Sequence, residues 1–265
     1  MEREPNFIPH NLPEEVRDDV KGYFKEREDK ALQERSEGEV EKTPEQLKFI
    51  DIITKCVIRE IESLGIEVKA ELTPEHIHFL TKEAFSNILT DRDPEDSLAF
   101  AHKRNYAIYV NTDEIKNRLQ FFMVMLHEIL HHFSYEKYHV DMVKRHLSDY
   151  RSGYVVYNSK SEKEPEHDHF YFLNEMVVHQ LVQRVFTQNQ ELLRREFNIT
   201  PEEERTTDVG YPVNSLNIFR KIIERIAKHQ NKRVIDVWKN YEQGFFTGEM
   251  MHLRDIEDVY GRGSL

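Results

Sequence analysis

The chain has 265 residues, of which 32% are charged and 38% hydrophobic, and its formal net charge is −12. This length allows one large domain or two small ones with a substantial core. The negative charge argues against nucleic-acid binding, which depends on clustered Lys and Arg side chains. We expect no membrane span and no signal peptide, since no run of about 18 apolar residues occurs and the N-terminal residues are polar. Cys56 is the single cysteine, which excludes an internal disulfide and favours the cytoplasm.

Residues 1–42 are dominated by charged side chains and are expected to form an arm or linker, partly helical or disordered. Val16, Val20 and Tyr23 or Phe24 recur at helical spacing within this arm. The spacing predicts a short helix that docks on the body of the protein through a narrow apolar stripe.

The remaining residues, 43–265, are predicted to form a single domain of the α+β class. In the first part, 43–140, helical segments alternate with short strands, which predicts a small antiparallel or mixed sheet packed against helices. In the second part, 141–265, apolar residues recur mostly at helical spacing, which predicts a mainly helical half.

Several helices are indicated by capping residues and by apolar periodicity. Thr43, Pro44 and Gln46 are typical of a helix start, and Gly65 is typical of a helix end. Thr81 is expected to begin a short second helix. Further helices are predicted over 119–138, 140–147, 170–186, 212–229, 232–241 and 248–260. Thr112 or Asp113 is expected to cap the first helix of that set.

Strands are predicted where the polarity of the side chains alternates. His76–Leu80 has this pattern, which would place His76 and His78 on one face, where solvent exposure explains them better than metal binding does. Further strand candidates lie at 97–101, 105–111 and 153–158, the first two forming a β-hairpin. The strand Ala107–Asn111 either presents an open edge to an extended peptide or lies inside the sheet.

His127, Glu128 and His131 lie in a long helical segment with an apolar face. The spacing of four residues puts both imidazoles on one side of the helix, where they can bind one zinc ion. Glu128 would then flank a water molecule that the ion activates, as in the H-E-x-x-H pattern of zinc peptidases. The alternative is a core helix whose histidines only form hydrogen bonds, and His132, which points elsewhere, is interpreted in that way.

A zinc ion needs a third protein ligand. A third histidine close behind the motif is excluded, because Ser134 and Lys137 occupy the positions that such a pattern requires to be Gly and His. The remaining candidates are His139, Asp141, His146, the cluster at 167–169 and Glu175. We favour Glu175, because a carboxylate at the start of an apolar helix is costly unless it is paired or bound to a metal. The alternative places Glu175 on the solvent face of that helix.

The motif His127-Glu128-x-x-His131, followed by Leu173-Asn174-Glu175, resembles the gluzincin clan, the thermolysin-type zinc metallopeptidases. The order of elements is similar to that of the small minigluzincin members, over roughly residues 76–185. The resemblance implies a zincin-like fold, in which a small sheet packs on the active-site helix and a mostly helical half follows.

The resemblance also implies the composition of the site. One Zn²⁺ per chain would be bound by His127, His131 and Glu175, with Glu128 as the general base of peptide hydrolysis. Those families place an acidic residue four positions after the ligand glutamate, where this chain has His179. This departure bears on catalytic efficiency more than on zinc binding. In the other arrangement that we weighed, Glu175 and His179 both face the metal.

Other residues are candidates for supporting roles. Asn174 and His179 are expected to orient ligands, and a Tyr or His side chain is expected to donate a hydrogen bond to the oxyanion. The candidate donors are Tyr154, Tyr157, His169 and Tyr211. The sequence therefore predicts a zinc-dependent peptidase acting on a peptide or protein, with neither a nucleic-acid nor a membrane partner. Two alternatives remain, a zinc-binding regulatory or sensor protein with little proteolytic activity, and a non-enzymatic helical interaction protein with a chance motif.

Overall fold

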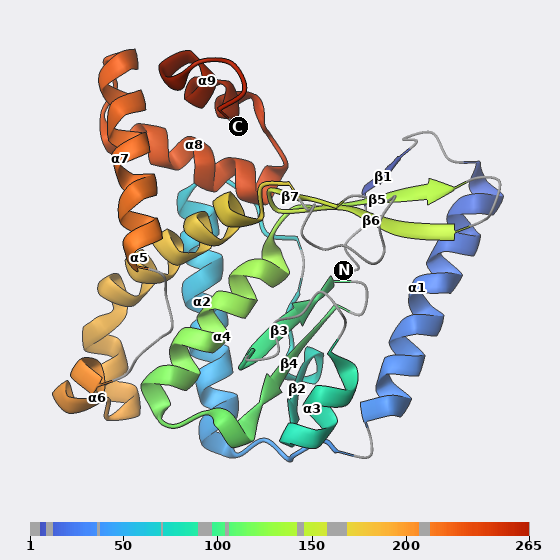
Figure 1. Cartoon of the computed structure of the whole chain (residues 1–265). Helices are drawn as coiled ribbons and strands as arrows, with labels where there is room; N and C mark the ends of the chain where they lie inside the picture. Colours follow the sequence, from blue (N-terminus) through green and yellow to red (C-terminus); the bar gives the residue numbers. More distant parts are fainter. Residues whose placement is uncertain are drawn as a thin grey trace.

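The computed structural model has the α+β architecture that was predicted, with helices and two small sheets (Figure 1). The structure describes residues 6–8, 13–35, 38–69, 71–89, 97–103, 106–141, 146–157, 169–206 and 213–264. Helix α4 (Arg118–Phe133) carries the H-E-x-x-H motif, and helix α5 (Tyr171–Phe197) carries the Asn-Glu pair. The two helices pack against each other in the main hydrophobic core.

Helix α2 (Pro44–Ser63) begins and ends where the sequence predicted. The Thr43 side chain accepts a hydrogen bond from the Gln46 amide, the Gln46 side chain accepts one from the Thr43 amide, and Pro44 is the first helical residue. Gly65 follows the helix with a φ of +82°, a backbone conformation that glycine adopts without strain. The buried face of α2 packs against α4 and α5.

The smaller sheet has three strands in the order β2 (Ile77–Leu80), β4 (Ala107–Asn111), β3 (Ala99–His102). It is a mixed sheet, as predicted, since β2 runs parallel and β3 antiparallel to β4. The predicted hairpin is therefore confirmed. Of the two alternatives for Ala107–Asn111, the structure supports the internal strand, because β4 is the central strand of this sheet.

The outer edges of this sheet differ from each other. The Val40 amide donates to the Phe79 carbonyl at 2.7 Å, and the Thr81 amide donates to the Gly38 carbonyl at 3.2 Å, so residues 38–40 cover the edge of β2. Within the described residues, no strand pairs with the outer edge of β3. Strand β3 is thus the outer strand on this side of the sheet, and it packs against α4.

The two faces of the sheet are covered by different helices, because side chains alternate along each strand. Phe79 and Val110 point into the main core with α2 and α4. Tyr109 and Phe100 point into a second cluster together with Phe85 of helix α3 (Lys82–Ile88). Thr81 caps α3, as predicted, by accepting a hydrogen bond from the Ala84 amide.

The predicted exposure of His78 is wrong, because β2 is buried on both faces. The His78 side chain is 3% exposed, and its Nδ1 atom lies 2.9 Å from Glu39 Oε1. His76 does not belong to the strand, since it ends the short 3₁₀ turn η1 (Pro74–His76). The polar contact of His78 is thus made by Glu39, in the segment that covers the edge of β2, rather than by solvent.

Both ends of α4 differ from the prediction. The helix is capped by Asn117, whose Oδ1 accepts the Gln120 amide at 2.8 Å, because Thr112 and Asp113 lie in the separate 3₁₀ turn η3 (Thr112–Glu114). At the other end α4 stops at Phe133 instead of continuing to residue 138.

The segment after α4 forms a β-hairpin where helices were predicted over residues 134–138 and 140–147. Strands β5 (Glu136–Asp141) and β6 (His146–Ser152) pair antiparallel. Along β5, buried Glu136, Tyr138 and Val140 alternate with less buried residues, which is the period of a strand. The hairpin also lies across the boundary expected at residue 140.

The larger sheet has the order β1-β5-β6-β7, with β1 (Asn6–Ile8) parallel to β5 and the short β7 (Val155–Val156) at the other end. The candidate strand at 153–158 thus corresponds to two residues of β7. Helix α1 (Glu14–Arg35) docks on this sheet, and its 22 residues make it longer than the short helix expected. The prediction that this helix docks through a narrow apolar stripe is confirmed, since Val20 and Phe24 pack on Tyr138 and Val140 of β5.

The C-terminal half consists mainly of helices, as predicted, and Figure 1 shows them together on the side away from α1. They are α5, α6 (Pro201–Thr206), α7 (Val213–Gln230), α8 (Val234–Thr247) and α9 (Arg254–Tyr260), with the 3₁₀ turn η5 (Met251–Leu253) before α9. None of the helices in the described ranges combines the length and the apolar character that crossing a membrane requires.

A buried group of charges joins three helices of the core. Arg184 of α5 lies 2.6 Å and 2.8 Å from the two carboxylate oxygens of Glu242 of α8, and it also forms an ion pair with Glu60 of α2. Glu242 is fully buried and Glu60 is 6% exposed. One guanidinium therefore compensates two carboxylates at the point where α2, α5 and α8 meet.

Candidate metal centre

The two histidines of the H-E-x-x-H motif project from the same side of α4, as their spacing predicts. His127 Nε2 and His131 Nε2 lie 2.9 Å apart, and the ring centroids are separated by 4.6 Å. Both side chains are 15% exposed. Two imidazole nitrogens thus converge on one point close to the surface of the helix.

Glu175 reaches the same point from α5. Its Oε2 atom lies 3.4 Å from His127 Nε2, and its Oε1 atom lies 3.5 Å from His131 Nε2. In a tetrahedral zinc site with bonds of about 2.0–2.1 Å, the ligand atoms are separated by about 3.3 Å. Each imidazole faces a different oxygen of Glu175, and the facing atoms of the three residues, here called the donor triangle, lie 2.9–3.5 Å apart. These separations are close to those that a zinc ion requires, so the residues present fit that ion.

The electrostatics of Glu175 favour an ionised carboxylate. Burial alone would raise the pKa of Glu175, but the positive charge of His131 and hydrogen bonds from His127 and His131 outweigh it. The pKa of Glu175 is consequently lowered well below its usual value. A negative ligand between two imidazoles is thus available at every pH near neutrality.

Asn174 holds the carboxylate of Glu175 in place. Its Nδ2 donates to Glu175 Oε1 at 3.3 Å, and its Oδ1 accepts the Tyr154 amide at 2.9 Å. Asn174 is 3% exposed, and Gly153, with a φ of +55°, brings the backbone so close that an added Cβ would meet Asn174 Oδ1 at 2.3 Å. The turn before β7 and the start of α5 therefore fix the side chain that orients Glu175.

Substitution of Asn174 by aspartate is expected to weaken zinc binding by about 10–100-fold, the usual effect of a group that orients a metal ligand. The variant keeps the size and the acceptor oxygen but loses the donor to Glu175 and adds a neighbouring negative charge. Competition with a chromophoric chelator measures the change in affinity. An unchanged affinity would contradict this role, and Asn189→Asp, on the same helix, serves as the matched control.

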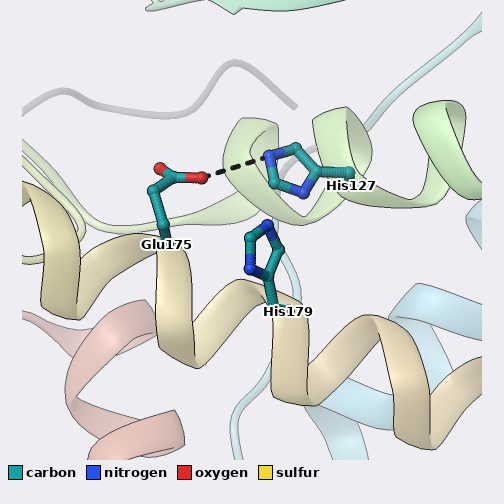
Figure 2. Close-up of side chains that lie close together, drawn as sticks. All are labelled: His127, Glu175 and His179. Atoms are coloured by element: carbon teal, nitrogen blue, oxygen red, sulfur yellow. Dashed lines mark ion pairs between the residues drawn. The ribbon is translucent and has the colours of Figure 1, made fainter. Parts of the chain in front are cut away.

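His179 lies one turn after Glu175 on the same face of α5 and is 5% exposed. Its ring centroid is 5.4 Å from that of His127, and Figure 2 shows both His179 and Glu175 pointing from α5 toward His127. Burial and the neighbouring His127 lower the pKa of His179 to about 3, so the imidazole is neutral. The structure therefore brings His179 to the same group of donors.

Glu128 follows His127 on α4 and is buried. Burial, with a contribution from the nearby Glu175, raises the pKa of Glu128 to about 7, against opposing effects that include His127 and a hydrogen bond from the Ala101 backbone. Ala101 belongs to β3, the strand with the uncovered edge. A carboxyl group with this pKa can accept and release a proton near neutral pH.

Lys103 joins the end of β3 to the end of α4. Its ammonium group donates to the carbonyls of His131 and His132, and it lies 2.9 Å from Ser134 Oγ and 3.1 Å from Glu136 Oε1. A cation at a helix C-terminus stabilises the exposed carbonyls. Lys103 therefore explains why α4 ends at Phe133, and it anchors the turn of helix that carries His131.

Of the candidate hydrogen-bond donors to the oxyanion, Tyr154 is engaged away from this group. The Tyr154 hydroxyl donates to the Tyr241 carbonyl at 2.7 Å and lies 2.5 Å from His252 Nε2, so it serves the packing of α8 and η5. His169 is exposed and pairs with Val156 through its backbone. The Tyr157 amide donates to the Tyr150 carbonyl at 3.0 Å. Tyr211 lies outside the described residues.

Two residues near the site were missed by the sequence reasoning, Ala101 and Lys103. Neither belongs to a recognisable pattern, because the first acts through its backbone amide and the second through a contact across the fold.

Of the alternative third ligands, His139 and Asp141 belong to β5 and His146 to β6, while residues 167–168 lie outside the described ranges. The ring of His132 packs near that of His76, with 6.5 Å between the two ring centroids.

Comparison with known proteins adds no relative to this picture. No family model, no curated protein and no solved structure matches the chain.

Proposed function

We propose that the chain is a zinc-dependent peptidase with a zincin-like fold, in which one Zn²⁺ is bound by His127, His131 and Glu175. The observation that supports this proposal most strongly is the donor triangle, three residues from two helices whose facing atoms lie 2.9, 3.4 and 3.5 Å apart. Two imidazoles and one carboxylate leave a tetrahedral zinc ion one position for a reacting molecule.

A zinc ion in this site would supply Lewis-acid chemistry, lowering the pKa of a water molecule and polarising a peptide carbonyl. Glu128 is the base that accepts the proton of the attacking water and then passes it to the leaving amine. Its pKa of about 7 suits both halves of this transfer. Ala101 holds the carboxyl group through its backbone amide, and Glu175 stays ionised beside the two imidazoles.

The edge of β3 is the element that we propose for binding the substrate backbone. The Asn111 amide donates to the Leu98 carbonyl, so the backbone groups of Leu98 and Phe100 face β4 while those of Ala99 and Ala101 face outward. Because the Ala101 amide reaches Glu128, an extended peptide paired with this edge would run past the catalytic base.

Substitution of Ala99 by proline is expected to lower kcat/KM for peptides by about fivefold to tenfold, the value of one hydrogen bond. The proline removes an outward-facing donor, and an edge strand tolerates it because the ladder to β4 is unaffected. Steady-state kinetics on a peptide and on a small ester measure the effect. Equal losses on both substrates, or none on the peptide, would contradict the pairing.

A zinc-binding regulatory or sensor protein is the second candidate function. The observation that favours it is His179, a third imidazole beside the donor triangle, since protein ligands that fill a zinc site leave no position for a reacting molecule. The two functions share the metal and differ in turnover.

One experiment tests the proposed activity. The chain is incubated with a library of peptides, in the presence and absence of a zinc chelator, and cleavage products are identified by mass spectrometry. Cleavage that stops with the chelator and returns with zinc supports the peptidase. Zinc binding without any cleavage would favour the regulator.

We propose the cytoplasm as the compartment, because the single cysteine leaves no internal disulfide to maintain.

A further inference from the structure

His179 is the buried titratable group at the site that the proposed mechanism does not use. It follows Glu175 by one helical turn on α5, so both side chains leave the helix in the same direction. Figure 2 shows the His179 ring rising from α5 toward His127, beside the Glu175 carboxylate. With only 5% of its surface exposed, the ring has few directions open to it other than toward the other donors.

The donor atoms form two overlapping groups of three. His127, His131 and Glu175 form the tight triangle with edges of 2.9–3.5 Å. His127, Glu175 and His179 also offer donor atoms that all lie within 4.8 Å of one another. The two groups share His127 and Glu175, so four potential ligands gather between α4 and α5.

We propose that His179 is a fourth protein ligand of the metal ion in the resting state and must leave before a water molecule can be activated. This inference rests on the proposed zinc site and concerns its regulation. The ligand atoms of a tetrahedral site are about 3.3 Å apart, so the imidazole of His179 has to approach the donor atoms of His127 and Glu175 by at most about 1.5 Å. A side-chain rotation covers this distance without movement of α5.

The charge of the site permits this fourth ligand. A neutral imidazole adds no charge, so a Zn²⁺ ion with three imidazoles and one carboxylate keeps the net charge of +1 that it has with two imidazoles. Exchange of His179 for a water molecule replaces one neutral ligand by another. No proton and no electron is needed for the exchange, which makes it a reversible switch between a closed and an open site.

The closed state has a definite consequence for activity. A zinc site with four protein ligands is structural, and one with three is catalytic. If His179 competes with water, the wild-type chain hydrolyses slowly in relation to its bound zinc, and removal of His179 increases turnover per zinc while weakening zinc binding. A residue that only orients His127 would have the opposite effect on turnover.

The coordination of the metal in the full-length chain tests the proposal directly. X-ray absorption of the zinc-loaded protein counts the imidazoles, and the visible spectrum of the Co²⁺-loaded protein reports coordination number. We expect three imidazoles in the wild type and two in His179→Ala, with a zinc affinity that is lower by at least about tenfold. His179→Gln, which preserves volume, repeats the test if the alanine variant is unstable. The exposed His229 supplies the matched control, His229→Ala, which should keep three.

The outcomes separate this inference from the function on which it rests. Zinc bound through two imidazoles in both wild type and His179→Ala, with equal affinity, would overturn the fourth ligand and leave the zinc site standing. A wild-type chain that binds no zinc would overturn both. Higher kcat at saturating zinc in His179→Ala, together with the loss of one imidazole, would support the switch.

Discussion

Replacement of Glu128 by glutamine is expected to lower kcat/KM for peptides by about 10²–10⁴-fold, the usual contribution of a general base. Zinc content should not change, because Glu128 is not one of the three converging donors. The measurements are steady-state kinetics on a cleaved peptide and metal analysis of the purified variant. Glu175→Gln is the matched control, since it should lose zinc as well as activity. Equal turnover in Glu128→Gln and the wild type would rule out Glu128 as the base.

The same variant is expected to be more stable than the wild type above pH 7. Burial raises the pKa of Glu128 from 4.5 to about 7, so ionisation of this carboxyl costs the folded state free energy. This free-energy cost is absent below the unfolded-state pKa of 4.5 and grows as the pH rises toward the folded-state pKa of about 7. Above that pH it levels off at about 3 kcal/mol. Urea denaturation at pH 5 and pH 8 measures it. A stability difference that does not grow with pH would contradict the raised pKa.

Replacement of Arg184 by methionine is expected to lower the free energy of unfolding by about 3–5 kcal/mol, because it leaves buried carboxylates without compensation. Glu242 is fully buried and Glu60 nearly so, and the guanidinium of Arg184 pairs with both. Burial already raises the pKa of Glu242, and loss of the guanidinium removes the group that opposes this rise. Denaturation at neutral pH measures the loss.

A triple variant controls for the removal of the guanidinium itself. With Glu60, Arg184 and Glu242 all replaced by apolar residues of similar volume, no uncompensated charge remains, and stability should return to within about 1–2 kcal/mol of the wild type. A loss below about 1 kcal/mol in Arg184→Met alone would show that water reaches the carboxylates and that the group is not a buried cluster.

Some features of the fold are readable from the sequence because they depend on neighbouring residues. The capping box at Thr43 and Gln46 requires residues three apart, and it starts α2 where predicted. The spacing of His127 and His131 sets their common direction through helix geometry alone. The approach of Glu175 was inferred from the cost of a carboxylate in an apolar segment, and the structure places it against both imidazoles.

Other features depend on contacts between distant segments and could not be read from local patterns. The helix predicted after Phe133 does not form: Lys103, 28 residues before His131, binds the carbonyls at the end of α4, and Glu136 enters a strand. The sequence left open whether β4 is an edge or an internal strand, because the alternation of side chains does not encode the order in which strands pair. His78 is buried only because Glu39, from a segment read as linker, covers it.

The candidate metal centre could be predicted only in part from local sequence patterns. Motif spacing indicates the histidines, but the role of His179 depends on the angle at which α5 crosses α4, which no sequence pattern sets. The same holds for the amide of Ala101, which reaches Glu128 only because β3 lies along α4. Side-chain identity therefore predicted the candidate ligands, and tertiary packing brings them together.

The most direct test of the zinc centre is the metal content of the purified full-length chain after dialysis against buffer without metal. About one zinc per chain is expected for the wild type and for the exposed control His229→Ala, and a large loss is expected for His127→Ala, because His127 belongs to both groups of donors. Less than about 0.3 zinc per chain in the wild type, with no further loss in His127→Ala, would contradict the zinc centre.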